Sequence, residues 1–183
     1  MVLTDLDEVR RRAEQRRGEF ELLAYSMQRR PKINDAKLDA YVEEIAAPII
    51  AAIDCKQCAN CCHNLNVYLL PEDAQRLSDG LMIPLEEVET RYIEHAEAEK
   101  VDEWGKFRTR PCVFLSGKLC SIYEHRPGAC RTYPAFTPDF RWTIADTIEG
   151  ASICPIIYNV LSTLCDQLLK PSKQPPPKSS LEK

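Results

Sequence analysis

The sequence lacks any long uninterrupted run of apolar residues. A membrane-spanning helix needs about 18 apolar residues or more in succession, whereas the longest apolar stretch here, residues 45–53, is interrupted by Pro48. The first residues contain Asp5, Asp7 and Glu8 and no apolar core of a secretory signal, and such acids are rare in transit peptides. We therefore expect no membrane association and a cytoplasmic location.

The chain also lacks two features of proteins that bind nucleic acids or nucleotides. Proteins that bind nucleic acids gain much of their affinity by neutralising phosphates with lysine and arginine, but 24 basic residues here face 28 acidic ones, a net charge of -4. The arginine-rich stripe at residues 10–17 is interpreted as a solvated helix face. Only six glycines are present, and no glycine-rich nucleotide loop is evident. We expect no nucleic-acid partner.

The 183 residues, 44% of them apolar, are enough for one domain with a core. Apolar periodicity and the positions of proline and glycine predict a helix-rich α+β fold, a small single domain with a short β-hairpin and cysteine-lined loops. The expected helices lie at residues 4–28, 34–53, 71–80, 84–96, 127–134 and 155–168. The expected strands lie at residues 67–70, in a hairpin over 111–123, and at 140–144, where Phe140, Trp142 and Ile144 alternate with polar residues.

The predicted organisation has three parts. Residues 1–33 form an N-terminal amphipathic helical extension, residues 34–170 form a cysteine-cluster metal-binding domain, and residues 171–183 form a disordered tail. The tail sequence has almost no apolar side chains, so it cannot bury enough surface to fold.

Nine cysteines are an unusual number for a chain expected in a reducing compartment, where clustered thiols indicate metal ligands or redox groups. The first group is Cys55, Cys58, Cys61 and Cys62, with gaps of two residues that let the backbone wrap around one ion or cluster. The same repeated spacing opens the iron–sulfur motif of bacterial ferredoxins. Four cysteines within eight residues therefore predict a metal centre.

The second group is dispersed and consists of Cys112, Cys120, Cys130 and Cys154. The first two flank the hairpin turn; a two-residue loop would place them on opposite faces and a three- or five-residue loop on one face. We expect Cys154 at the start of the last helix, where the helix dipole favours a thiolate. All eight cysteines are predicted metal ligands, because buried thiols acting as small hydrophobes fit this spacing poorly. Cys165, inside an apolar helix, is expected to be a core thiol.

Other polar residues near these cysteines have weaker signals. Arg126 and Arg131 bracket Cys130 and could offset the negative charge of metal-bound thiolates, although ordinary surface ion pairs are nearly as good an interpretation. His63 and His125 could be ligands, but a solvated or hydrogen-bonded role is favoured for both. His95 is expected on an exposed helix face.

The pattern resembles the CxxCxxCC cysteine-cluster family, described as a proposed zinc- or iron-chelating domain. The resemblance rests on the first cysteine group, on Cys112-Val-Phe-Leu, and on the segment from Cys120-Ser-Ile-Tyr through Arg126-Pro127 to Cys130-Arg-x-Tyr-Pro. It covers residues 50–160. A flagellin lysine methyltransferase resembles the same family and is linked to an iron–sulfur cluster, so the resemblance implies that some members modify proteins.

Three functions are weighed. The favoured one is a [4Fe–4S] cluster held by Cys55, Cys58 and Cys61 with Cys62 or Cys154, the remaining thiols completing a second site. The second is an interaction module that has two structural zinc sites and a protein partner. The third is a cluster-dependent protein-modifying enzyme or thiol oxidoreductase, with polar groups around an open metal position supplied by Tyr123, Arg126, Arg131 and Tyr133. Whether the chain is an enzyme stays open.

Overall fold

The computed structural model describes residues 2–29 and 34–169, and the predicted tail at 171–183 lies outside them. The described chain is a helix-rich α+β protein with a few short antiparallel strands, as predicted. Its internal contacts separate two compact units. Unit 1 contains the described residues up to Ile53 together with those from Phe136 onward, and unit 2 is Asp54–Ala135.

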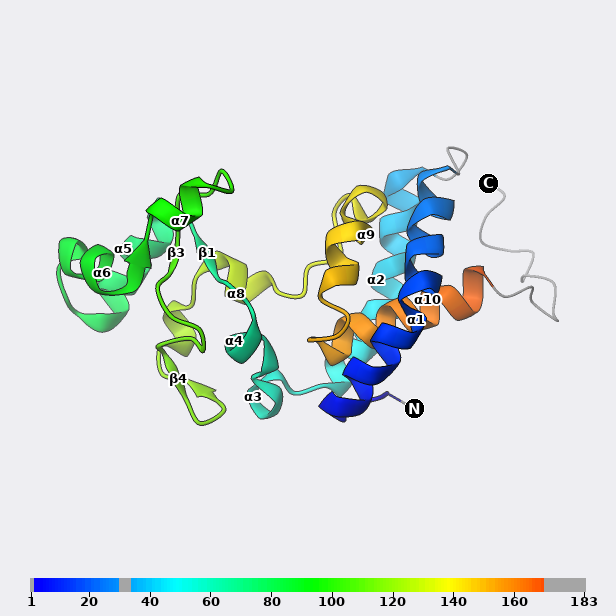
Figure 1. The fold of residues 1–183 in the computed structure, drawn as a ribbon, viewed down its shortest axis with the longest axis horizontal. Helices are drawn as coiled ribbons and strands as arrows, with labels where there is room; N and C mark the ends of the chain where they lie inside the picture. Colours follow the sequence, from blue (N-terminus) through cyan, green and yellow to red (C-terminus); the bar gives the residue numbers. More distant parts are fainter. Residues whose placement is uncertain (1, 30–33, 170–183) are drawn as a thin grey trace. The chain divides into compact units, whose positions relative to one another are not determined.

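Unit 1 is built from four helices, α1 (Leu6–Gln28), α2 (Asp35–Ala52), α9 (Phe140–Glu149) and α10 (Pro155–Leu168) (Figure 1). α1 packs against α9 and α10, and α2 packs against the same two helices. α10 contributes a nearly continuous apolar surface, with Val160, Leu161 and Leu164 fully buried. Among the described helices, none combines the length and apolar character needed to cross a bilayer.

The strand predicted at residues 140–144 is wrong, because these residues begin α9. The apparent alternation fails at Trp142, which is 60% exposed, whereas the guanidinium-bearing Arg141 is buried and donates a 2.5 Å hydrogen bond to Asp35. The Asp39 carboxylate on α2 accepts the backbone N–H groups of Asp139 and Phe140, at 2.9 and 3.0 Å. A cap supplied by a distant helix therefore decides the local structure.

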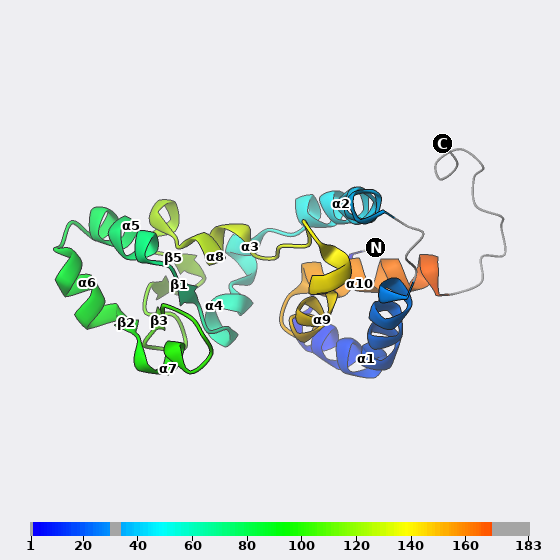
Figure 2. The same cartoon turned by 90° about the horizontal axis from the view of Figure 1, so that it is seen from above.

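Unit 2 combines short helices with two small antiparallel sheets (Figure 2). The first sheet has the strand order β1-β3-β2, and the second is the hairpin β4-β5. The strands are β1 (Tyr68–Leu69), β2 (Ile93–Glu94), β3 (Gly105–Phe107), β4 (Leu115–Ser116) and β5 (Leu119–Cys120). The helices are α3 (Cys55–Cys58), α4 (Asn60–Asn64), α5 (Pro71–Leu81), α6 (Leu85–Tyr92), α7 (Ala96–Glu99), the 3₁₀ turn η1 (Tyr123–His125) and α8 (Gly128–Thr132).

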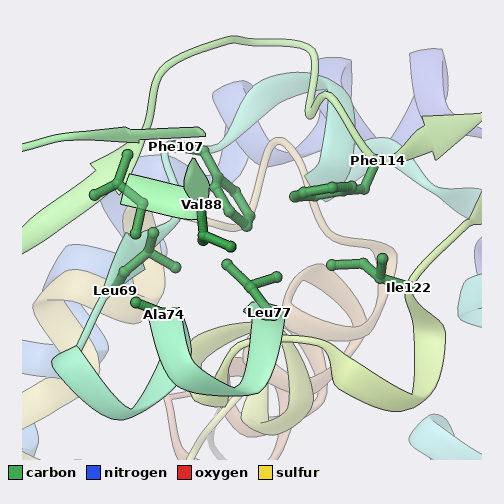
Figure 3. Packing of buried hydrophobic residues seen from close by; sticks show 8 residues of the cluster. Leu69, Ala74, Leu77, Val88, Phe107, Phe114 and Ile122 are labelled. Atoms are coloured by element: carbon green, nitrogen blue, oxygen red, sulfur yellow. The ribbon is translucent and has the colours of Figure 1, made fainter. Parts of the chain in front are cut away.

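The core of unit 2 lies between α5, α6, the three-stranded sheet and the chain around the hairpin. Figure 3 shows Leu77 of α5 and Val88 of α6 close to the rings of Phe107 and Phe114. The two rings meet edge to face, with centroids 5.4 Å apart. Cys112 and Cys120 are partly buried against this cluster. The apolar core thus fixes the backbone that carries two of the predicted ligands.

One buried carboxylate and one close contact at a glycine fix the position of α5. The buried carboxylate of Asp73 accepts the N–H of Leu70, at 3.0 Å, and the N–H of Gly128, at 2.8 Å, so it links the first turn of α5 to α8. Gly80, expected at the end of this helix, lies within it, and a Cβ there would come 2.4 Å from Cγ of His125. Glycine is needed because α5 and η1 approach closely.

Candidate metal centre

The first cysteine group lies on two short helices separated by one left-handed residue. Asp54 caps α3 by accepting the Lys56 N–H at 2.9 Å. Ala59, at φ 52° and buried, ends α3 and begins α4, so Cys55 and Cys58 precede the turn and Cys61 and Cys62 follow it. A non-glycine residue in this conformation stores strain and is retained only where surrounding structure holds it.

The hairpin resolves the register that the sequence left open. Leu115 pairs with Cys120 and Ser116 with Leu119, so the loop is the two-residue Gly117-Lys118, with Gly117 at φ +62°. Cys112 lies outside the ladder, in a turn closed by the N–H of Leu115. The two-residue loop therefore does not decide on which face of the hairpin Cys112 lies, because Cys112 is outside the strand pairing.

Backbone N–H groups point at the sulfurs of this region. The N–H of Phe114 bonds to the Cys112 sulfur and the N–H of Ile122 to the Cys120 sulfur, and each contact lowers the pKa of its thiol against the larger effect of burial, which raises it. Both donors lie two residues after the cysteine they contact. Such bonds favour a thiolate, the form in which cysteine binds metals. In addition, the N–H of Cys112 donates to the carbonyl of Cys62 at 2.9 Å, which joins the two cysteine groups.

Cys62 and Cys130 show opposite electrostatic environments. A hydrogen bond from Cys61, with the two sulfurs 4.0 Å apart, and the charge of Arg126 lower the pKa of Cys62 to about 6. Burial, reinforced by the neighbouring thiols, raises the pKa of Cys130 on α8 to about 12. Without a metal, Cys62 therefore ionises more readily than Cys130.

Seven of the eight predicted ligands lie in unit 2, and charge interactions or a hydrogen bond link all seven: Cys55, Cys58, Cys61, Cys62, Cys112, Cys120 and Cys130. Cys62 interacts with members of every segment. Cys154 lies in unit 1, where it is buried at the N-cap of α10. None of the nine cysteines forms a disulfide. An all-sulfur donor set of this kind suits zinc or an iron–sulfur cluster.

The cysteine sulfurs of unit 2 lie in one region but do not surround a common metal position. Within residues 2–29 and 34–169, no three His, Cys, Asp or Glu side chains are grouped so as to hold a metal ion as they stand. The donor chemistry fits, and binding a metal would need the sulfurs to close in. Such closure couples metal binding to local folding, as in other thiolate sites.

The remaining predicted residues are distributed unevenly. Arg126 lies among the thiols, whereas Arg131 and His63 are exposed. His125 packs against Gly80. The interpretation of His95 as an exposed helix residue is wrong, since it is half-buried and its Nδ1 lies 2.7 Å from the carbonyl oxygen of Trp104.

The remaining side chains to be placed are Tyr133, Cys165 and Lys56. Tyr133 is half-buried. Cys165 is a core thiol as expected, 1% exposed, with its sulfur donating to the carbonyl of Glu19 at 3.6 Å. Lys56 was not predicted; its Nζ lies 4.6 Å from the centroid of the Tyr123 ring. No spacing rule in the sequence connects Lys56 with Tyr123, because they belong to different segments.

Comparison with known proteins gives one match. The model of the CxxCxxCC family, described as "Putative zinc- or iron-chelating domain", matches residues 54–155, which include all eight predicted ligands. No curated protein and no solved structure matches. The family assignment supports metal binding and confirms the resemblance noted in the sequence. Because the match covers more than half of the 183 residues, the chain belongs to the CxxCxxCC family.

Proposed function

We propose that this chain is a metal-binding protein whose centre is a [4Fe–4S] cluster. Its ligands are Cys55, Cys58 and Cys61 together with Cys62, and the remaining thiols of unit 2 complete a second site. The observation that supports it is that Cys62 in unit 2 interacts with thiols of all three cysteine-bearing segments, and that the N–H of Cys112 donates to the carbonyl of Cys62 at 2.9 Å.

Iron–sulfur is favoured over zinc by the tight spacing of the first cysteine group. Two successive two-residue gaps match the ferredoxin run. All-thiolate zinc sites usually pair two separate C-x2-C segments. In this chain the C-x2-C spacing occurs in one segment, residues 55–62. Zinc bound by the same thiols in a protein-interaction module is the alternative outcome of the test.

A bound [4Fe–4S] cluster supplies one-electron chemistry. The residues of the chain bind it, shield it and set its charge. Cys112 and Cys120, which belong to the second site, are partly buried against the core, and this limits access of water to their sulfurs. The N–H groups of Phe114 and Ile122 would stabilise these two sulfurs as metal-bound thiolates.

The test is metal and sulfide analysis of protein purified without oxygen, together with its visible absorption. We expect a brown protein with iron and acid-labile sulfide in equal amounts. Cys55→Ser should lose most of the colour and iron. Cys165→Ala is the matched control, because this core thiol lies in α10, and it should retain both.

A colourless protein with stoichiometric zinc, lost in Cys55→Ser, would replace the cluster by the zinc alternative. Protein that holds neither metal under reducing conditions, or a Cys55→Ser variant that binds as much as the wild type, would refute metal binding by this group.

A further inference from the structure

Two cations meet on one aromatic ring beside the cysteines. The guanidinium carbon of Arg126 lies 3.6 Å from the centroid of the Tyr123 ring, and Nζ of Lys56 lies 4.6 Å from the same centroid. Lys56 stands inside the first C-x2-C pair on α3, whereas Tyr123 and Arg126 lie between the cysteines of β5 and α8. The ring therefore joins two cysteine-bearing segments that are distant in sequence.

The backbone fixes Arg126 in this place. Its Nε donates to the carbonyl of Tyr123 at 2.8 Å, so the guanidinium plane is held at the ring. Among the described residues, its terminal Nη groups donate to no protein oxygen. These groups are thus left for acceptors that the polypeptide oxygens do not supply.

Neither cation forms an ion pair with a carboxylate of the described residues. Elsewhere, arginines pair with acids, as Arg91 does with Glu87 at 2.5 Å. In the described part of the chain, neither Lys56 nor Arg126 has a carboxylate within ion-pair distance. A cation–π contact is worth about 0.5–1 kcal/mol at exposed sites, and two like charges on one ring repel. A nearby anion would reduce the repulsion between Lys56 and Arg126.

Arg126 stands between Cys120 and Cys130 in the sequence, and the Tyr123 ring that it contacts also contacts Lys56, which lies between Cys55 and Cys58. One guanidinium is therefore held beside cysteine-bearing chain from three segments. Arg131, which is as close to Cys130 in sequence, is exposed on α8.

We propose that Arg126 is a positioning residue of the metal centre, held on Tyr123 beside Lys56, where it supplies the counter-charge of the metal-bound thiolates. Four thiolates around a divalent ion leave a net charge of about −2, which a fixed guanidinium stabilises relative to the metal-free state. Through Tyr123, the same contact holds α3 near the segment that carries Arg126. The counter-charge role rests on the proposed metal binding, and the contact between the two segments does not.

The first arm of the test measures the Zn²⁺ affinity of reduced protein by competition with a chromophoric chelator. Loss of a partner outside the ligand shell typically costs about 10–100-fold in metal affinity. We expect Arg126→Met to weaken binding by about tenfold or more, Arg126→Lys by less, and the control Arg131→Met by no more than about twofold. Equal affinities of Arg126→Met and Arg131→Met would overturn the counter-charge role.

The second arm needs no metal. Hydrogen exchange of the metal-free protein should show faster exchange of amides in α3 for Tyr123→Leu and Arg126→Met, with α6 unchanged as evidence of an intact core. Tyr123→Phe should behave as the wild type, because the ring and not its hydroxyl makes the contact. Unchanged exchange in α3 would overturn the linkage even if the wild type binds zinc. A wild type that binds no metal would instead refute the proposed function, while this arm still decides the contact.

Discussion

At the scale of single residues, the thiols of unit 2 differ by environment more than by position in the motif. A hydrogen bond with Cys61 and the charge of Arg126 lower the pKa of Cys62 to about 6, whereas burial raises the pKa of Cys130 to about 12. The sequence spacing predicts that these cysteines gather, because short gaps return the chain to one point. Spacing alone could not predict which thiol ionises first, since that depends on contacts such as the Phe114 N–H.

The stability of the reduced, metal-free protein should fall as pH rises above about 9. Burial raises the pKa of Cys130 from 9.0 to about 12, and it also raises the pKa of Cys55, Cys112 and Cys120. Each of these thiols keeps its proton more tightly when folded, so its contribution is complete below the unfolded pKa and is lost as pH rises through the folded one. Urea unfolding with reductant and chelator measures this.

Cys62 contributes with the opposite sign. Its pKa is lowered to about 6, so its contribution is present above 9 and is lost as pH falls through 6. Above pH 9 the contribution of Cys62 no longer changes, so the four thiols with raised pKa values determine the loss of stability there. Cys130→Ser should flatten the slope above pH 9, and a stability that increased with pH there would contradict the assignment of Cys130 as half-buried and protonated.

At the scale of elements, the long helices, β1 and the β4-β5 hairpin were predictable, whereas β2 and β3 were not. α1, α2, α5, α6 and α10 follow apolar periodicity with start signals such as Asn34 and Pro71, and the structure confirms them. β2 and β3 are two and three residues long and depend on pairing between distant segments, Ile93 with Phe107 for example, so no local pattern indicates them. The α9 error has the same origin, because Asp39 provides its cap.

Two helix glycines should respond to alanine with opposite signs. A Cβ added at Gly18 in α1 would meet no atom within 4 Å beyond the neighbouring backbone of its own helix. Gly18→Ala should therefore stabilise the protein by up to about 1 kcal/mol through helix propensity. At Gly80 in α5 the same gain is opposed by the clash with His125, and overpacking costs about 1–3 kcal/mol. Gly80→Ala should therefore destabilise. Urea unfolding of both variants checks this, and a stabilising Gly80→Ala would show that η1 yields easily.

At the scale of the whole molecule, the two units differ in what stabilises them. Unit 1 has a helical core built around α10, in which Val160, Leu161 and Leu164 are fully buried. Unit 2 has a smaller apolar cluster, short elements and seven cysteines. The sequence indicated the fold class but not this division, because unit 1 is assembled from residues on both sides of the cysteine-bearing segment. The predicted domain boundaries at 33 and 170 stay predictions.

Metal removal should therefore loosen one unit selectively. A structural zinc site contributes about 10–16 kcal/mol in small domains, comparable with the stability of a whole domain. Treatment of the metal-loaded protein with a chelator under reducing conditions should increase amide exchange in residues 54–135 and leave α1 and α10 protected. Exchange that is unchanged throughout would contradict a structural contribution of the metal, and equal loss in both units would contradict their independence.

The discontinuity of unit 1 has a consequence for biosynthesis. Residues 54–135 are synthesised before α9 and α10. α1 and α2 must meanwhile wait for their partners with apolar faces such as that of Phe20 unsatisfied. The cysteine-bearing unit is thus synthesised in full before the helical unit can close its core.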